Sequence, residues 1–292
     1  MNSGILFALG AYLSWGLFPL YFRQIAAIPA LQIVAHRTLW SLAFVAVVLL
    51  VTGHLKWLRD VSAATWRRFA VSAALIAVNW LAYVWAVGHG HVIDASLGYF
   101  INPLVNVALG FAVLHERPRP VQWLAVGLAA FGVLWLTFAA GKLPWIALVL
   151  AISFGLYGLM RKTAALGAIE GLTLETLILA PLAAAGLAFW WQAGDLAGQT
   201  AVDWAWLVGT GPVTAGALLL FAAGARRIPL ATLGVVQYAS PSLQFLLGVF
   251  LFKEPMSASR LVAFGFIWSA LAVYSAEGLW QTRRALQVRP VS

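Results

Sequence analysis

Polar side chains are scarce in this sequence, and several fall inside long apolar runs where they could bind a small polar molecule. Asn79 and Tyr83 have i, i+4 spacing, so an amide and a phenol share one face of an expected helix. An unpaired amide is costly in hydrocarbon, so such side chains should face protein or water. They predict either a substrate cavity or hydrogen bonds between neighbouring helices. The candidate binding residues of this kind are Asn79, Tyr83, Tyr99, Asn102, Gln237 and Ser240.

Two similar short motifs add aromatic side chains to these candidates. Ser14-Trp15-Gly16 in the first half of the chain corresponds to Ser153-Phe154-Gly155 in the second half, and Tyr157 follows the second motif. An aromatic ring beside a binding site can shield the apolar part of a substrate, although packing is the commoner role of such rings. Ser14, Trp15 and Tyr157 are therefore candidate binding residues, with helix packing as the alternative.

Prolines and charged residues inside the apolar runs could act as hinges or gates during transport. A proline in a helix interior frees a backbone carbonyl, which could contact substrate or let the helix bend; a passive kink is the alternative. His36, Arg37 and Glu175 lie about two turns inside their runs, near enough to an end for long side chains to reach the interface, as in snorkelling. A gate or a structural ion pair is the other interpretation. The candidate hinge residues are Pro19, Pro103, Pro212 and Pro241.

Enzymatic chemistry finds no support in the motifs. The sequence holds no H-E-x-x-H, no G-x-S-x-G and no paired aspartates within an apolar run, and it contains no cysteine. We therefore expect no catalytic residue, no metal site, no cofactor and no enzyme activity. No Asp or Glu falls at the expected middle of a run, which leaves His36 as the candidate for titration near pH 7.

The composition is that of a membrane protein. Hydrophobic residues make up 63% of the chain and charged residues 9%, against roughly 45–50% and about 25% in soluble domains. The apolar runs have the length of a bilayer-spanning helix, and the alternating pattern of a β-barrel is absent. The net charge of +9 comes from Lys and Arg in short loops, so we expect a lipid bilayer as partner and no nucleic acid.

Ten membrane-spanning helices account for the apolar runs. Lys and Arg gather in the loops on the side of the termini, which predicts that both termini are cytoplasmic. Small residues in the last span of each half, such as Gly127, Gly132, Gly265 and Ser269, either support helix packing or form a homodimer contact. The expected spans lie near 3–22, 30–52, 69–88, 94–114, 120–139, 143–160, 171–191, 204–224, 229–251 and 258–279.

The sequence indicates one five-helix unit written twice. Pro103, Gly110 and Glu116 recur with the same spacing in the second half of the chain, as Pro241, Gly248 and Glu254. Because five spans is an odd number, the second copy enters the bilayer in the opposite direction. Such inverted repeats are typical of secondary transporters, with the substrate site at the repeat interface near the midplane. We predict repeats at 3–139 and 143–279, followed by a cytoplasmic tail at 280–292.

Several strings resemble a known transporter family. Asn79-Trp80, the run ASLGYFINPL from Ala95 to Leu104, and Ser14-Trp15-Gly16 are similar to the RarD-type branch of the EamA-like drug/metabolite transporter superfamily, which is related to YddG-type amino-acid exporters. The likeness covers nearly the whole chain. It implies ten helices in two inverted five-helix repeats, a bacterial inner-membrane location and export of small metabolites.

These observations predict an all-α membrane protein that exports amino acids or similar small zwitterions by alternating access. Because no acid falls at the expected midplane, transport down the substrate's own gradient is the leading hypothesis. The alternative is a drug or toxic-compound efflux permease, which would need a wide aromatic cavity. The partners expected from sequence are a small-molecule substrate, the lipid bilayer and, if the small residues serve it, a second copy of the chain.

Overall fold

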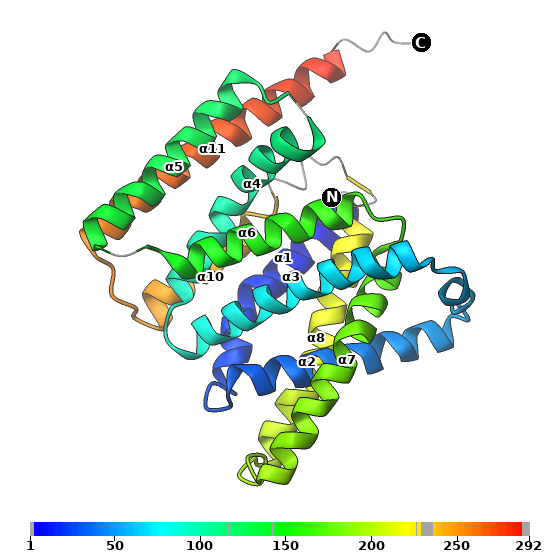
Figure 1. The fold of residues 1–292 in the computed structure, drawn as a ribbon. Helices are drawn as coiled ribbons and strands as arrows, with labels where there is room; N and C mark the ends of the chain where they lie inside the picture. Colours follow the sequence, from blue (N-terminus) through cyan, green and yellow to red (C-terminus); the bar gives the residue numbers. More distant parts are fainter. Residues whose placement is uncertain (1–2, 116, 142, 226, 229–235, 288–292) are drawn as a thin grey trace.

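The computed structural model describes residues 3–115, 117–141, 143–225, 227–228 and 236–287, and within these ranges every regular element is helical (Figure 1). Glu116 of the repeated motif, the start of the ninth expected span and the end of the tail lie outside the described residues. The elements are α1 (Ser3–Arg23), α2 (Ala30–Val51), the 3₁₀ turn η1 (Lys56–Asp60), α3 (Ala63–Gly88), α4 (Val92–Leu114), α5 (Pro120–Ala140), α6 (Trp145–Lys162), α7 (Ala168–Ala193), α8 (Ala201–Ala225), α10 (Ala239–Leu246), η2 (Leu247–Leu251) and α11 (Ala258–Gln287).

The helices have the length and composition of membrane spans. Eight are long and apolar enough to cross a bilayer, and α6 and the α10–η2 segment are shorter apolar helices. The chain is thus an all-helical multi-pass membrane protein. α3 begins at Ala63 rather than near 69 because the Ser62 side chain caps it, accepting a 3.2 Å hydrogen bond from the Thr65 backbone N–H. Trp66 therefore lies within α3.

The described part of the ninth expected span is only partly α-helical. α10 is short and continues into η2, a π-helical turn. Gln237 lies in the turn before α10, outside the helix that carries Ser240. Pro241 is the third residue of α10, where a backbone N–H has no intrahelical partner to lose. The expectation that Pro241 interrupts a helix interior is therefore wrong, whereas Pro19, Pro103 and Pro212 do lie inside α1, α4 and α8.

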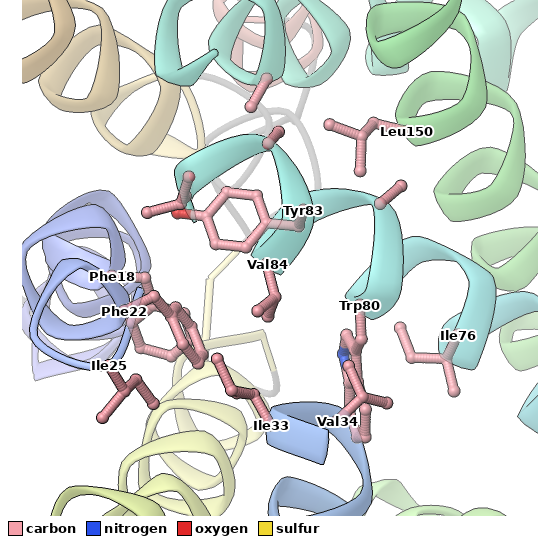
Figure 2. Packing of buried hydrophobic residues seen from close by; sticks show 14 of the residues in the cluster. Phe18, Phe22, Ile25, Ile33, Val34, Ile76, Trp80, Tyr83, Val84 and Leu150 are labelled. Carbon is pink, nitrogen blue, oxygen red and sulfur yellow. The ribbon is translucent and has the colours of Figure 1, made fainter. Parts of the chain in front are cut away.

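The helices pack as a central group with a peripheral pair. α2 lies against α7 and α8, α1 packs along α8, and both α3 and α4 pack along α6. α5 and α11 lie side by side at one edge of the molecule (Figure 1). Where α1, α2 and α3 meet, Phe18, Phe22, Val34, Trp80 and Tyr83 form part of a large buried cluster (Figure 2). This cluster places aromatic rings around the inward faces of the helices that carry the candidate residues.

α4 depends on a residue far away in sequence for its N-terminal cap. The Glu254 carboxylate, in the loop between η2 and α11, accepts hydrogen bonds from the backbone N–H groups of Val92 (2.7 Å) and Ile93 (2.9 Å). Arg260 of α11 donates to Asp94 of α4 over 3.1 Å. Burial raises the pKa of the Glu254 carboxyl, and the two N–H groups act in the opposite direction. A carboxylate at a helix N-terminus satisfies orphan donors and complements the helix dipole.

One glycine allows the close approach of α5 and α11. A Cβ atom at Gly132 would lie 3.0 Å from the Ala263 carbonyl oxygen and 3.2 Å from the Phe266 Cβ. A Cβ atom at Gly127 or Gly265 would meet nothing within 4 Å. Of these three glycines, Gly132 is therefore the one that the helix contact requires.

Replacing Glu254 by Ala should destabilise the protein by about 1–2 kcal/mol, because two N–H groups at the start of α4 lose their acceptor. Thermal unfolding of the purified protein in detergent measures the change. Glu254→Gln, which keeps one acceptor oxygen, should fall between Glu254→Ala and the wild type. Equal unfolding midpoints for wild type and Glu254→Ala would show that the cap contributes nothing.

Gly132→Val should destabilise the α5–α11 contact by about 1–3 kcal/mol, since the added methyl groups overpack a tight helix crossing. Gly127→Val on the same helix is the matched control, because it carries the same change in helix propensity into open space. Thermal melts of the two variants in one detergent separate packing from propensity. A midpoint for Gly127→Val as low as that for Gly132→Val would contradict the assignment.

Candidate functional site

Asn79 stands at the centre of a buried polar network that joins three helices. Its side-chain Nδ2 donates to the Ser153 hydroxyl (3.0 Å) and to the Leu150 carbonyl (3.2 Å), both on α6. The Tyr99 hydroxyl of α4 donates to Asn79 Oδ1 over 3.2 Å. The sequence placed Asn79 and Tyr99 on separate helices, and the structure brings them together.

Asn102 makes a second amide link between α4 and α6. Its Nδ2 donates to the Ala151 carbonyl (3.1 Å), and its Oδ1 accepts from Asn106 one turn further on (3.3 Å). Asn79 and Asn102 are both buried, at 2% and 5% exposure. Both amides thus form the helix-to-helix hydrogen bonds that the sequence offered as one of two interpretations.

Tyr83 differs from these amides because its hydroxyl makes no hydrogen bond to the described residues. The side chain is buried, and its oxygen has no hydrogen-bond partner in the described part of the chain. The ring lies 5.8 Å from Tyr99 and 6.1 Å from Phe22, measured between ring centroids. In Figure 2 it extends from α3 toward Phe18 and Phe22 of α1. A buried hydroxyl without a partner is a group that a ligand could satisfy.

Tyr157 belongs to a buried acidic network. Its hydroxyl donates to Glu175 Oε2 (3.2 Å), while the Ser72 hydroxyl donates to Oε1 (2.5 Å). Arg161 lies 3.9 Å from the same carboxylate. Glu175 is only 1% exposed, so it does not reach the interface as the snorkelling expectation required. The Tyr157 ring also lies 5.9 Å from Phe154, which connects this network to the aromatic cluster.

Ser14 and Trp15 lie on the other side of the central group. The Ser14 hydroxyl donates to the Gly10 carbonyl of its own helix over 2.7 Å. The Trp15 ring packs against Tyr12 (5.4 Å) and Phe221 (5.6 Å), at the contact of α1 with α8. These contacts match the packing alternative that the sequence left open for both residues.

The candidates near α10 meet α1 through Gln244. Its Nε2 donates to the Trp15 carbonyl (3.2 Å) and to the Ser240 hydroxyl (3.3 Å). Its Oε1 is buried and has no hydrogen-bond partner among the described residues. Ser240 is thus placed in the interior by α10, one turn before Gln244.

The contact between a buried Arg37 and Trp80 was not predicted from the sequence. Arg37 is 4% exposed, so the snorkelling expectation is wrong for it. Its Nε donates to Thr214 of α8 (2.9 Å), and its guanidinium carbon lies 4.1 Å from the centre of the Trp80 ring. The neighbouring His36 is buried too, with its ring edge-on to Trp204 at 5.1 Å. The usable signal was an arginine about two turns inside an apolar helix, since a charge at that depth needs a partner.

Other kinds of site are less well supported. No group of three His, Asp or Glu side chains gathers as metal ligands within the described ranges. An apolar groove lies on α5 and α11, away from the polar networks, and none of the candidate residues lines it. Its walls are Trp123, Leu124, Gly127, Leu128, Phe131 and Phe266.

Comparison with known proteins places the chain among transporters. The profile of the EamA-like transporter family matches residues 2–138. An uncharacterized transporter of Pseudomonas aeruginosa is 48% identical over 98% of this chain and 97% of its own length. Protein RarD of Escherichia coli is 44% identical over 97% of each chain. A chloramphenicol-sensitive protein RarD of Pseudomonas aeruginosa is 30% identical over 98% of this chain and 96% of its own.

A solved structure shares the fold of this chain. A crystal structure that is 22% identical superposes with a TM-score of 0.61, over 95% of this chain and 97% of the other. Together with the full-length identities to RarD proteins, the buried polar networks and apolar helices are those of a membrane transporter. The chain belongs to the EamA-like transporter family, as a RarD-type member of the drug/metabolite transporter superfamily.

Proposed function

We propose that this transporter is a bacterial inner-membrane permease, and not an enzyme, that exports amino acids or similar small zwitterions by alternating access. The observation that carries the proposal is the set of buried polar groups between the helices. The Asn79–Tyr99 pair, the Glu175 network and Arg37 lie inside spans that are otherwise apolar. Polar and charged groups at membrane depth are expensive and mark transport pathways.

The inverted repeat proposed from sequence is supported by how the helices pair. α1 packs on α8 as α6 packs on α3, and α2 packs on α8 as α7 packs on α3. α4 contacts α6 as α10 contacts α1, while α2–α7, α4–α10 and α5–α11 each pair equivalent helices. Exchanging the two halves therefore leaves this pattern of contacts unchanged. Ten spans then follow if α6 and the α10–η2 segment are counted with the eight longer helices.

Individual contacts follow the same exchange. A Cβ atom on Gly16 would lie 3.0 Å from Leu243, and one on Gly155 would lie 2.7 Å from Val105. The repeated motifs align Gly16 with Gly155, and they align Val105 with Leu243. These pairs support repeats at 3–139 and 143–279. With the Lys and Arg distribution, both termini and the tail at 280–292 are assigned to the cytoplasm.

In this proposal the polar head of the substrate binds between α3, α4 and α10, and bends at prolines assist the change of state. The Tyr83 hydroxyl in the first half of the chain and Gln244 Oε1 in the second half are both buried without a hydrogen-bond partner among the described residues, so both could bind the substrate. The substrate-binding proposal keeps the sequence candidates Ser14, Trp15, Asn79, Tyr83, Tyr99, Asn102, Tyr157, Gln237 and Ser240, with Pro19, Pro103 and Pro212 as hinges.

Drug efflux is the second candidate. One relative carries the name chloramphenicol-sensitive protein RarD, which directs this alternative to chloramphenicol as a test compound. Aromatic rings around Trp15, Tyr12 and Phe221 could hold an apolar compound. Saturable transport of chloramphenicol without transport of amino acids would favour this alternative.

Purified protein in liposomes loaded with radiolabelled amino acids should release at least one of them faster than protein-free liposomes. Because the proposal has no coupling ion, the flux should follow the amino-acid gradient and persist when the pH is equal on both sides. A panel of the common amino acids, run with and without a pH gradient, measures this. No protein-dependent flux for any member would reject the substrate class.

Tyr83→Phe should raise the KM for the transported amino acid several-fold while leaving thermal stability equal to or above that of the wild type. The hydroxyl has no partner to lose in the described structure, so its removal costs the fold nothing. Tyr157→Phe is a control for stability alone, because it removes a hydroxyl that bonds Glu175 and should lower the unfolding midpoint. An unchanged KM for Tyr83→Phe would remove Tyr83 from the site.

A further inference from the structure

Arg37 is a buried cation that has no counter-charge among the described residues. It is 4% exposed and lies about two turns inside α2. Its Nε donates to Thr214, which is neutral, and none of the described residues forms an ion pair or hydrogen bond with its two terminal nitrogens. A buried charge left without a partner is strongly destabilising in water-free surroundings. The fold therefore holds a charged group whose best hydrogen-bonding atoms are unused.

The surroundings of Arg37 are aromatic rather than acidic. The guanidinium carbon lies 4.1 Å from the Trp80 ring centre, 5.5 Å from Phe22 and 5.7 Å from Phe18. Such rings attract a cation, but they accept no conventional hydrogen bond from its N–H groups. The Tyr83 ring, whose hydroxyl has no partner among the described residues, lies 6.1 Å from the same Phe22 ring. The terminal nitrogens of Arg37 on α2 and the hydroxyl of Tyr83 on α3 thus lie among the same aromatic rings without hydrogen-bond partners in the described structure.

Glu175 shows what a satisfied buried charge looks like in the same protein. Glu175 is the eighth residue of α7, as Arg37 is the eighth residue of α2. Ser72 and Tyr157 donate hydrogen bonds to its carboxylate, and Arg161 lies 3.9 Å away. The protein therefore supplies a full set of partners to one of the two equivalent charges. Arg37, the other one, bonds only the neutral Thr214 and has no anionic partner in the described part of the chain.

We infer that Arg37 and the Tyr83 hydroxyl form a binding site for the carboxylate group of a substrate. This inference rests on the proposed function and deepens it by assigning one end of the zwitterion. The planar fork of a guanidinium matches the two oxygens of a carboxylate, and it donates to both at once. A carboxylate carries the single negative charge that neutralises Arg37, whereas a doubly charged phosphate would leave an excess charge in the membrane.

Binding can be tested through ligand-dependent thermal stability, because a ligand that binds only the folded state raises the unfolding midpoint. The probes are L-phenylalanine, L-leucine, L-methionine and L-threonine, each beside its C-terminal amide, together with 3-phenylpropionate. The amides keep the amino group and the side chain but lack the carboxylate. Purified wild-type protein should be stabilised by at least one acid and at least tenfold less sensitive to the matching amide.

Variants then assign the effect to Arg37. Arg37→Gln should abolish the difference between acid and amide, and Arg37→Lys should retain part of it because the charge remains. Without ligand, Arg37→Gln should unfold at or above the wild-type midpoint, since an uncompensated charge is removed. Arg260→Gln, which removes an arginine bonded to Asp94, is the control that should keep the full difference. If Arg37→Gln does not fold, the carboxylate site is tested by the difference between acid and amide in the wild type. That difference should be smaller in Arg37→Lys.

The outcomes separate this inference from the proposed function. Amino-acid flux with an unchanged KM in Arg37→Gln, or equal stabilisation of the wild type by acids and amides, would overturn the carboxylate site and leave the permease proposal standing. Stabilisation by 3-phenylpropionate with no amino-acid flux would support the site and overturn the substrate class. No response of the wild type to any carboxylate, in binding or in flux, would overturn both.

Discussion

Hydrogen bonds from buried amides to the backbone of α6 hold the interior of this protein together. In hydrocarbon, an amide that finds no partner carries its full desolvation cost, so Asn79 and Asn102 fix where α3 and α4 lie against α6. The Tyr99 hydroxyl then bonds Asn79, and the aromatic rings pack around this framework. The positions of Tyr83, Trp80 and Arg37 follow from that arrangement.

Much of this fold could be predicted from the sequence. Long apolar runs with few charges leave little choice but membrane helices, and the repeated proline and glycine spacing indicated two related halves. Helical periodicity also placed Asn79 and Tyr83 on one face of α3, where both are buried. The periodicity of a single helix does not reveal which neighbour that face meets. The bonds of Asn79 and Asn102 to α6 were therefore one of two predictions rather than the only one.

The rest depended on contacts between distant segments. The Arg37 side chain is long enough to reach the interface, but α8 and α3 enclose it with Thr214 and Trp80. Similarly, an apolar run predicts an unbroken ninth helix. The residues around Leu246 contain no sequence signal for the π-helical turn that follows. Trp80 has no polar side chain to single it out in an apolar run, so its contact with the guanidinium could not be predicted from α3 alone.

The carboxylate of Glu254 ties α4 to the segment that joins η2 to α11. Arg260 and Asp94 add an ionic contact between the same two elements. Separating them would strip two backbone N–H groups of their acceptor at a helix end. If these elements separate during the proposed alternating access, the opening must offset the loss of two charge-assisted hydrogen bonds. Under the proposed alternating access, a loop residue that need not touch the substrate would therefore contribute to the relative populations of the two states.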